Sequence, residues 1–497
     1  MTERAGGVLL HPTSLPGKYG IGTLGEAARD FIDFLSKAKQ RYWQVLPLGP
    51  TGFADSPYQC FSAHAGNPNM IDLDELVTEK WLDPAVLLQS PRFNQDQVDF
   101  DRIQKFRTPL LKMAYQRFTE HRDPTVKLGF RNFLKEHYRW VNDYALFQAI
   151  KSHFDGEPWY RWEKKIRERE PEAMTYFQNL LREETDYHKF LQYLFFRQYF
   201  SIKSYAHKKS IRIIGDLPIY VALDSADTWA DPTIFELDSA MCPQRVGGVP
   251  PDYFTEDGQL WGNPLFRWKE KQEEVFQWWA DRIETNLNLF DIIRIDHFRG
   301  FEAFWAVPAT ETTARDGEWV EGPGKDFFTY LTKKFGFLPF IAEDLGVITP
   351  AVDELRDAFI FPGMKVLSFA FDSSEANNYL PYTYSKNCVV YTGTHDNDTT
   401  VGWFESASDD NRNYALEYLN SSGADIHWEM IRLAWSSVAN TAIVPVQDLL
   451  GLDSRARMNI PGTIQNNWRW RASRSCFTDK LAERMAHLSI LYGRANG

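Results

Sequence analysis

The chain has 497 residues, of which 43% are hydrophobic, and it carries a formal net charge of −12. This hydrophobic content can fill a large buried core, which excludes a globally disordered chain. The acidic balance, with no stripe of Lys and Arg, argues against nucleic acid or an anionic membrane as a partner.

The cysteine spacing and the apolar content of the sequence indicate the cellular compartment. Cys60, Cys242, Cys388 and Cys476 lie far apart with no CxxC spacing. Such spacing argues against a zinc site or a disulfide framework and is typical of a reducing compartment. No apolar run approaches the ~18 residues of a membrane span, and residues 1–10 lack the apolar segment of a secretory signal. We therefore expect a cytoplasmic protein.

In chain order, the first predicted elements are two strands with a helix between them. Residues 7–10 are an apolar run that ends in a Gly-rich loop, and residues 42–48 are a second run that ends in a turn-rich segment. Residues 24–38 show helical periodicity, with their large apolar side chains on one face.

Residues 73–209 differ from this pattern because long helical segments dominate them. Helical periodicity covers residues 100–118, 130–154 and 173–207. We interpret residues 73–209 as a mostly helical insertion subdomain whose aromatic side chains serve core packing better than a cofactor site. The remaining parts, 1–72 and 210–497, would then form the catalytic domain.

Strand-like runs return after residue 210 and alternate with helical stretches. The six further predicted strands are residues 211–216, 291–297, 340–344, 364–370, 388–392 and 441–446. With the first two they predict an α/β fold, a (β/α)8 TIM barrel with the helical insertion between strands 2 and 3 and further loop insertions. A doubly wound open sheet is the alternative, but no GxGxxG motif follows the first strand.

Polar residues stand where several of these strands end. They are Asp216, Asp296, Glu343, the pair His395 and Asp396, and the pair Gln447 and Asp448. Because functional groups of such barrels gather at the carboxyl ends of the strands, we expect these side chains to converge at one mouth. Several acids without metal-ligand spacing indicate acid–base and nucleophilic chemistry on a neutral polar substrate. Glycosyl transfer fits, since it needs one protonated and one ionised carboxyl group.

Asp296 is the candidate for the ionised carboxylate. Arg294 lies two residues before it, so both side chains face the same way in a strand, and the cation favours the charged form. A structural ion pair beside a core strand is the alternative interpretation. Glu343 follows three apolar residues, so burial should raise its pKa and suit it to general acid catalysis. The adjacent Asp344 is an equal candidate on chemistry alone.

The pair His395 and Asp396 also has alternatives. Asp396 could hold substrate hydroxyls with help from His395, but the surrounding composition is typical of a plain turn as well. A metal-dependent phosphohydrolase built on His and Asp would need further histidines at ligand spacing, and the 11 histidines of the chain are scattered.

Several motifs in fixed order resemble a known family. Residues 294–297 (RIDH), 342–346 (AEDLG) and 394–397 (THDN) resemble signature regions of the α-amylase clan. Other stretches narrow the resemblance to the amylomaltases, which are 4-α-glucanotransferases. These stretches are residues 56–59 (SPYQ), 65–68 (AGNP), 215–221 (GDLPIYV), 250–254 (PPDYF), 258–262 (GQLWG), 459–463 (NIPGT) and the pair Asn467-Trp468. The resemblance covers essentially the whole chain.

The resemblance implies a retaining double displacement. In it, an α-1,4-glucan segment moves from a donor maltodextrin to the 4-hydroxyl of an acceptor glucan or glucose. Asp296 would be the nucleophile, Glu343 the general acid and then base, and Asp396 the group that stabilises the transition state. The expected substrate-binding residues are Arg294, His395, Asp216, Tyr58, His297, Tyr253, Phe254, Trp261 and Asn467.

Tyr58, Tyr253 and Phe254 are expected at the site for physical reasons. Transfer requires that water be kept from the intermediate until an acceptor arrives, and residues 247–254 are a candidate lid. Its glycines would permit movement, and Tyr253 and Phe254 would cover or stack on glucan rings. Tyr58 would lie at the edge of the donor site and stack on a sugar ring. A tyrosine that only packs within a turn fits the same sequence.

We therefore expect α-1,4-glucans and maltooligosaccharides as donor and acceptor, and no nucleic acid or membrane partner. The calcium sites of many α-amylases are not recognisable, so we expect no metal and no cofactor. Two alternatives stay open, an α-glucan hydrolase or debranching enzyme of the same clan, and a catalytically silent glucan-binding protein.

Overall fold

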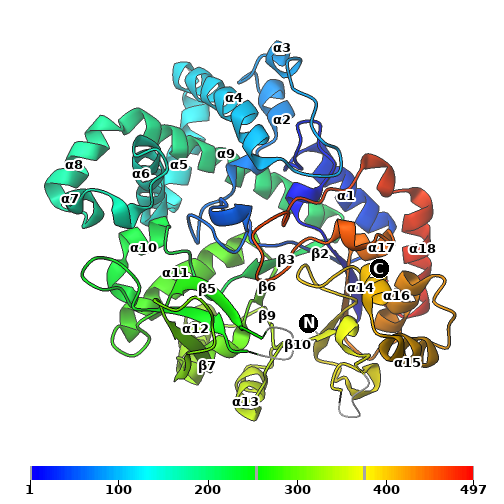
Figure 1. The fold of residues 1–497 in the computed structure, drawn as a ribbon. Helices are drawn as coiled ribbons and strands as arrows, with labels where there is room; N and C mark the ends of the chain where they lie inside the picture. Colours follow the sequence, from blue (N-terminus) through cyan, green and yellow to red (C-terminus); the bar gives the residue numbers. More distant parts are fainter. Residues whose placement is uncertain (1–2, 122, 252–255, 373–376, 496–497) are drawn as a thin grey trace.

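A ring of eight parallel strands is the centre of the computed structural model, which describes residues 3–121, 123–251, 256–372 and 377–495 (Figure 1). The strands are β1 (Ala5–Leu9), β2 (Tyr42–Gln44), β3 (Arg212–Leu217), β6 (Ile292–Ile295), β9 (Phe340–Ala342), β10 (Gly363–Val366), β11 (Cys388–Tyr391) and β12 (Thr441–Pro445). They pair in the order β10-β11-β12-β1-β2-β3-β6-β9. The N–H of Ala342 donates to the carbonyl of Pro362 at 2.9 Å, which brings the two edges of the sheet together. The predicted barrel is confirmed.

The strands are short, apolar and buried, as expected for parallel strands covered on both faces. Side chains from all eight form one apolar cluster inside the ring, with members such as Met364 and Val366, or Val389 and Tyr391, two positions apart on the same strand. Their neighbours on the other face pack against the surrounding helices. A sequence with this pattern leaves only the strand ends free for polar chemistry.

Helices follow most strands and cover the outside of the ring (Figure 1). They are α1 (Glu26–Lys37), α10 (Ala226–Ala230), α11 (Gln272–Leu289), α12 (Gly324–Phe335), α13 (Pro350–Ala358), α14 (Thr400–Ser406), α15 (Asp409–Leu419), α16 (Ile426–Ser436), α17 (Val446–Leu449) and α18 (Asp479–Leu491). In the described ranges, no helix combines the length and the apolar character that crossing a membrane requires.

The predicted helical insertion lies between β2 and β3. Its helices are α2 (Leu73–Thr78), α3 (Pro84–Leu87), α4 (Phe100–Glu120), α5 (Pro124–Glu136), α6 (Tyr138–His153), α7 (Lys164–Arg167), α8 (Pro171–Leu180) and α9 (Arg182–Lys208). Two predicted helices are each divided in the structure, at His137 between α5 and α6 and at Leu181 between α8 and α9. Periodicity did not reveal these breaks because apolar residues continue through both.

Two buried glutamines of α9 attach this insertion to the loop after β2. Gln192 exchanges hydrogen bonds with the N–H and C=O of Gly66 at 2.8 and 2.9 Å. Gln198 does the same with Asp72 at 2.7 and 3.2 Å. The loop that carries Tyr58 therefore takes part of its support from the insertion.

A second sheet, antiparallel and in the order β5-β4-β7-β8, lies beside the barrel and was not predicted. Its strands are β4 (Arg245–Val249), β5 (Gln259–Pro264), β7 (Ala303–Pro308) and β8 (Glu318–Glu321). All four are short, and glycines interrupt β4 and β5, which hides the alternation that identifies a strand.

This sheet corrects one part of the lid prediction for residues 247–254, the role of its two glycines. Gly247 and Gly248 lie in β4, which pairs with β5 and β7. A Cβ atom would lie 2.6 Å from the ring of Tyr220 at the first glycine, and 2.6 Å from a backbone oxygen at the second. These glycines permit close packing within a sheet and are not the predicted hinge. Tyr253 and Phe254 lie outside the described residues.

Candidate active site

The carboxyl ends of three neighbouring strands bring acidic residues together at one mouth of the barrel. Asp216 lies in β3, Asp296 follows β6 and Glu343 follows β9. The pairing of the strands continues to the last two, since Asp296 N–H donates to Leu217 O and Glu343 N–H to Ile295 O, both at 3.0 Å. The backbone positions of these residues are therefore fixed by the sheet.

Arg294 joins two of these acids. Its Nη1 donates to both carboxylate oxygens of Asp216 at 2.7 Å and to Oδ1 of Asp296 at 3.0 Å. The guanidinium and Asp216 are buried, whereas the side chain of Asp296 is 26% exposed. The predicted contact between Arg294 and Asp296 is present. A buried cation that lost these partners would be strongly destabilising, so the arrangement is also structural.

An aromatic group stands next to Asp216. The hydroxyl of Tyr58 donates to Asp216 Oδ2 at 2.7 Å, and its ring stacks on His395 with centroids 5.2 Å apart and an interplanar angle of 15°. Trp468 packs against both rings, at 5.7 and 6.0 Å. Tyr58 and His395 are therefore brought to the acidic cluster, and the hydroxyl of Tyr58 is held by a carboxylate.

The adjacent acids Glu343 and Asp344 have different surroundings. Asp344 forms an ion pair with Arg356 at 2.5 Å and accepts the N–H of Met364 at 2.6 Å, so it fastens the end of β9 to β10. Among the described residues, the side chain of Glu343 accepts only the N–H of His297, at 2.6 Å. Asp344 is therefore occupied by contacts within the scaffold, whereas Glu343 has no ion pair in this part of the chain, and this difference favours Glu343 as the candidate acid.

His297 reaches Glu343 through its backbone. The residue has φ 49° and ψ 51°, in the left-handed region, and this turns its N–H toward the carboxyl group. Its imidazole packs edge-on against Trp261, with centroids 4.9 Å apart, and burial lowers its pKa to about 3. The ring is neutral, and its buried Nε2 has no hydrogen-bond partner among the described residues.

Burial shifts both central acids toward the protonated form. It raises the pKa of Glu343 to about 7, against the opposing effect of Arg294. It also raises the pKa of Asp296, where Arg294 opposes the effect and Asp216 adds to it. Two carboxyl groups that interact titrate as a pair, so that one of them takes up its proton first as pH falls.

The position of this proton follows from the contacts. Asp296 accepts a hydrogen bond from a guanidinium at 3.0 Å, whereas Glu343, within the described part of the chain, accepts only a neutral N–H. The charge is therefore more stable on Asp296 and the proton on Glu343. This distribution agrees with the roles expected from the sequence.

Asp396 lies in the loop after β11 and is more exposed than Asp216 and Asp296, with 44% of its side chain accessible. Oδ1 accepts a hydrogen bond from Asn459 Nδ2 at 2.7 Å, and Oδ2 lies 3.4 Å from His395 Nε2. Arg457 donates to the carbonyl of Asp396 at 2.7 Å. The sequence does not reveal these contacts of Arg457 and Asn459, because they join segments more than 60 residues apart.

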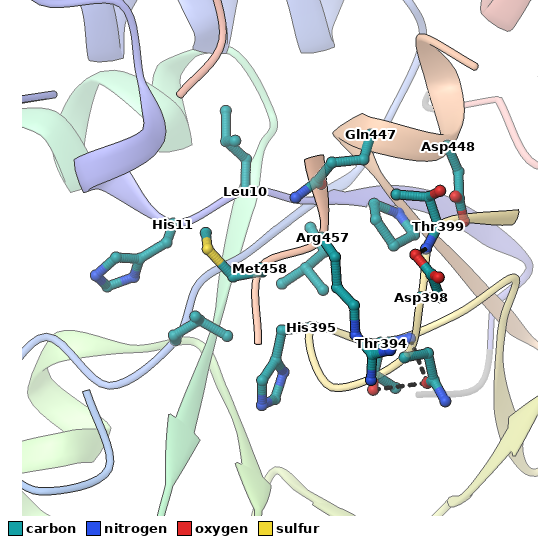
Figure 2. A pocket seen from close by; sticks show the side chains of 14 residues that line it. Leu10, His11, Thr394, His395, Asp398, Thr399, Gln447, Asp448, Arg457 and Met458 are labelled. Atoms are coloured by element: carbon teal, nitrogen blue, oxygen red, sulfur yellow. Dashed lines mark hydrogen bonds between the residues drawn. The ribbon is translucent and has the colours of Figure 1, made fainter. Parts of the chain in front are cut away.

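A pocket lies behind this loop (Figure 2). Arg457 extends from the chain after β12 toward Thr394 and the loop of His395. Gln447 and Asp448, which were expected after the eighth strand, lie in α17 and form hydrogen bonds with neighbouring segments here. Asp448 accepts the N–H of Thr400 at 2.7 Å, and Gln447 donates to Ala456 O at 3.3 Å.

Two predicted sugar-binding residues have scaffold contacts in the structure. Asn467 accepts the N–H of Ile460 at 3.0 Å and donates to the carbonyl of Thr463 at 2.9 Å, so its amide shapes the loop after β12. Trp261, in β5, donates its indole N–H to Gln259 Oε1 at 3.1 Å and presents its ring to His297. Within the described ranges, no group of three or more His, Cys, Asp or Glu side chains is arranged to hold a metal ion.

Comparison with known proteins gives the family. The family model described as 4-alpha-glucanotransferase matches residues 10–476. The chain is 51% identical to a 4-alpha-glucanotransferase of Synechocystis sp. over 498 aligned residues, with 99% of each chain covered. It is 50% identical to one from Thermus thermophilus, with 94% of each covered. The structure matches that of an amylomaltase from Streptococcus agalactiae in complex with acarbose, with a TM-score of 0.97, 40% identity, and 99% of this chain and 100% of that chain covered. The protein therefore belongs to the 4-alpha-glucanotransferase family.

Proposed function

We propose that the protein transfers α-1,4-glucan segments between maltooligosaccharides by a retaining double displacement. The observation that carries this proposal is the pair Asp296 and Glu343 at one barrel mouth, with a guanidinium on the first and a raised pKa of about 7 on the second. Identity to 4-alpha-glucanotransferases over nearly the whole chain supports it.

In the first step, Asp296 attacks the anomeric carbon of the donor sugar. Glu343 gives its proton to the glycosidic oxygen, the bond breaks, and the shortened glucan leaves with a free 4-hydroxyl group. The product is a glycosyl ester on Asp296. This step requires the two carboxyl groups to lie ~5–5.5 Å apart across the sugar.

In the second step, Glu343 works in the opposite direction. Its carboxylate takes the proton from the 4-hydroxyl of the acceptor, whose oxygen attacks the anomeric carbon and releases Asp296. Asp396 would accept hydrogen bonds from hydroxyl groups of the same sugar, because its side chain is more accessible than those of Asp216 and Asp296. Negative charge there would stabilise the positive charge that develops on the ring.

Preference for a sugar acceptor over water would come from the aromatic surroundings. The half-buried side chains of Tyr58 and Trp261 provide flat apolar faces near the acids, on which an acceptor glucan could stack. A stacked acceptor would exclude water from the glycosyl ester. Tyr253 and Phe254 would add to this surface from the segment after β4.

The test is incubation with maltotriose, followed by separation of the products. We expect glucose together with a ladder of maltodextrins longer than the substrate. Products no longer than the substrate would assign the protein to the hydrolases of the clan. Binding of maltotriose without any product would identify a glucan-binding protein that does no chemistry. The variant Asp296→Asn is the control for a contaminating activity.

We also propose a cytoplasmic setting and a division of the chain into a catalytic barrel (1–72 and 210–497) and a helical subdomain (73–209). The setting is supported by the cysteines, all of which are free thiols in the structure, as suits a reducing compartment. The division is supported by the run of helices α2 to α9 between β2 and β3.

A further inference from the structure

The segment after β12 holds the loop of Asp396 at three points. Asn459 Nδ2 donates to the carboxylate at 2.7 Å, Arg457 Nη2 donates to the backbone carbonyl of Asp396 at 2.7 Å, and Asn459 N–H donates to the carbonyl of His395 at 3.1 Å. We call Arg457 and Asn459 the Asp396 clamp. These bonds join two loops that are more than 60 residues apart in sequence.

The clamp is itself well supported. Arg457 Nε donates to the carbonyl of Asn459 at 2.8 Å, which links its two members directly. The next residue, Ile460, is held by Asn467 at 3.0 Å. Asp396 on its own is 44% exposed and follows a turn, so without Asn459 its carboxylate would be free to rotate.

Asn459 is also chemically suited to this place. Its amide donates a hydrogen bond but carries no charge, so it orients the carboxylate without neutralising it. Because Asn459 occupies Oδ1, the other oxygen is left on the side of His395, where a sugar hydroxyl can reach it. An arginine or lysine in the same position would compete with the charge that develops on the substrate.

We propose that Asn459 is a positioning residue for Asp396, and that Arg457 fixes the backbone on which this orientation depends. The inference rests on the proposed function, since it assigns to Asp396 a role in stabilising the transition state. Removal of the amide should affect the chemical step and leave ground-state binding of the donor nearly unchanged.

The first test compares Asn459→Ala with the wild type in the reaction with maltotriose. We expect kcat to fall by about 10²-fold, because a small misplacement of a group that acts in the transition state can cost this much. KM should stay within about threefold of the wild type. The matched control is Asn179→Ala, at an exposed position of α8, a helix that lies at the outer side of the helical insertion (Figure 1). Thermal unfolding of both variants shows whether each is folded.

The second test uses Asn459→Asp, which keeps the size of the side chain. At low pH the introduced carboxyl is protonated and its O–H can replace the amide donor. As pH rises it ionises beside Asp396 and repels it, and the orientation is lost. The ratio of kcat for this variant to that of the wild type should therefore fall steadily from about pH 5 to about pH 8. The same ratio for Asn459→Ala should stay flat.

Other ionisable groups near the carboxylate are the same in all variants. His395 lies 3.4 Å away, with its pKa lowered by burial, Arg457 contacts the backbone, and Asp296 and Glu343 lie across the site. Their titration appears in the wild type too and cancels in the ratio.

The outcomes separate this inference from the function on which it rests. If the wild type forms no maltodextrin ladder, the proposed function is wrong. If the wild type forms the ladder and Asn459→Ala keeps its kcat within about twofold, the clamp has no role in catalysis. A ratio of kcat for Asn459→Asp to that of the wild type that does not change with pH would also overturn the inference. This test uses only the change of the ratio with pH, so a constant difference in the folded fraction of the two proteins does not affect it.

Discussion

The backbone N–H of His297 donates to the carboxyl group of Glu343 at 2.6 Å, although the two residues follow different strands. The left-handed conformation of His297, with φ 49°, is what directs the N–H there. This conformation is tolerated by Asn and strongly disfavoured in β-branched residues.

We therefore expect His297→Asn and His297→Val to differ. The Asn variant should keep kcat within about fivefold, because it can adopt the same backbone, whereas the Val variant should lose more than about tenfold. Steady-state kinetics of glucose release from maltotriose measure both. Equal loss in the two variants would show that the imidazole matters and the backbone does not.

The raised pKa of Glu343 predicts a pH limit on activity. The acid form is needed to protonate the leaving group, so kcat/KM should fall as pH rises through about 7. In Glu343→Gln the remaining activity should be lower by at least about 10³-fold and should lack this alkaline limb. A full pH profile of both proteins is the measurement, and a limb that persists in the variant would move the assignment to another group.

The same shift has a consequence for stability. The ordinary pKa of 4.5 rises to about 7 in the native state, so the folded protein binds this proton more tightly than the unfolded chain. The free energy of unfolding therefore decreases as pH rises between these values. Glu343→Gln removes this effect and should stabilise the protein by ~1–3 kcal/mol at about pH 8, with little gain at about pH 4. Denaturant unfolding at the two pH values tests this.

Asp296→Asn should abolish transfer without unfolding the protein. The amide oxygen can still accept the hydrogen bond from Arg294, which also keeps both bonds to Asp216. We expect a loss of at least about 10³-fold in kcat, because a nucleophile has no substitute at the site. A thermal unfolding curve recorded alongside the kinetics checks the fold, and activity near that of the wild type would refute the assignment.

The neighbouring acid Asp344 should behave in the opposite way. Its contacts with Arg356 and with the N–H of Met364 hold β9 against β10. Asp344→Ala leaves a buried N–H without its acceptor and removes one of the three carboxylates that contact Arg356, which should lower the free energy of unfolding by ~1–3 kcal/mol. We expect the kcat of the folded fraction to stay within about tenfold of the wild type. A loss as deep as that of Glu343→Gln would place Asp344 in the chemistry.

The sequence predicted the parts of the molecule that depend on local pattern. The eight buried strands, their order, and the acids at their ends could be read because short apolar runs alternate with helices. The choice between Glu343 and Asp344 could not, since it depends on Arg356 and on the edge of β10, which only the folded chain brings near. Asn459 was hidden for the same reason, because its partner lies 63 residues away.

The antiparallel sheet marks another limit of pattern reading. Glycines in β4 suggested freedom of movement, but they are required by the ring of Tyr220 and by a backbone oxygen of β5. A glycine chosen for a close neighbour and one chosen for a hinge are identical in sequence. Because strands this short give no periodic signal, the sequence does not show that these glycines lie in a sheet.

The two glutamines of α9 have a practical consequence for redesign. A shortened enzyme from which α2 to α9 had been trimmed would leave the peptide groups of Gly66 and Asp72 without the amides that now bind them on both sides. The segment that carries Tyr58 would keep its contacts with the barrel but would lose the support that it takes from α9. A compact variant of this protein must therefore retain α9, or supply two other side chains that form hydrogen bonds with the same peptide groups.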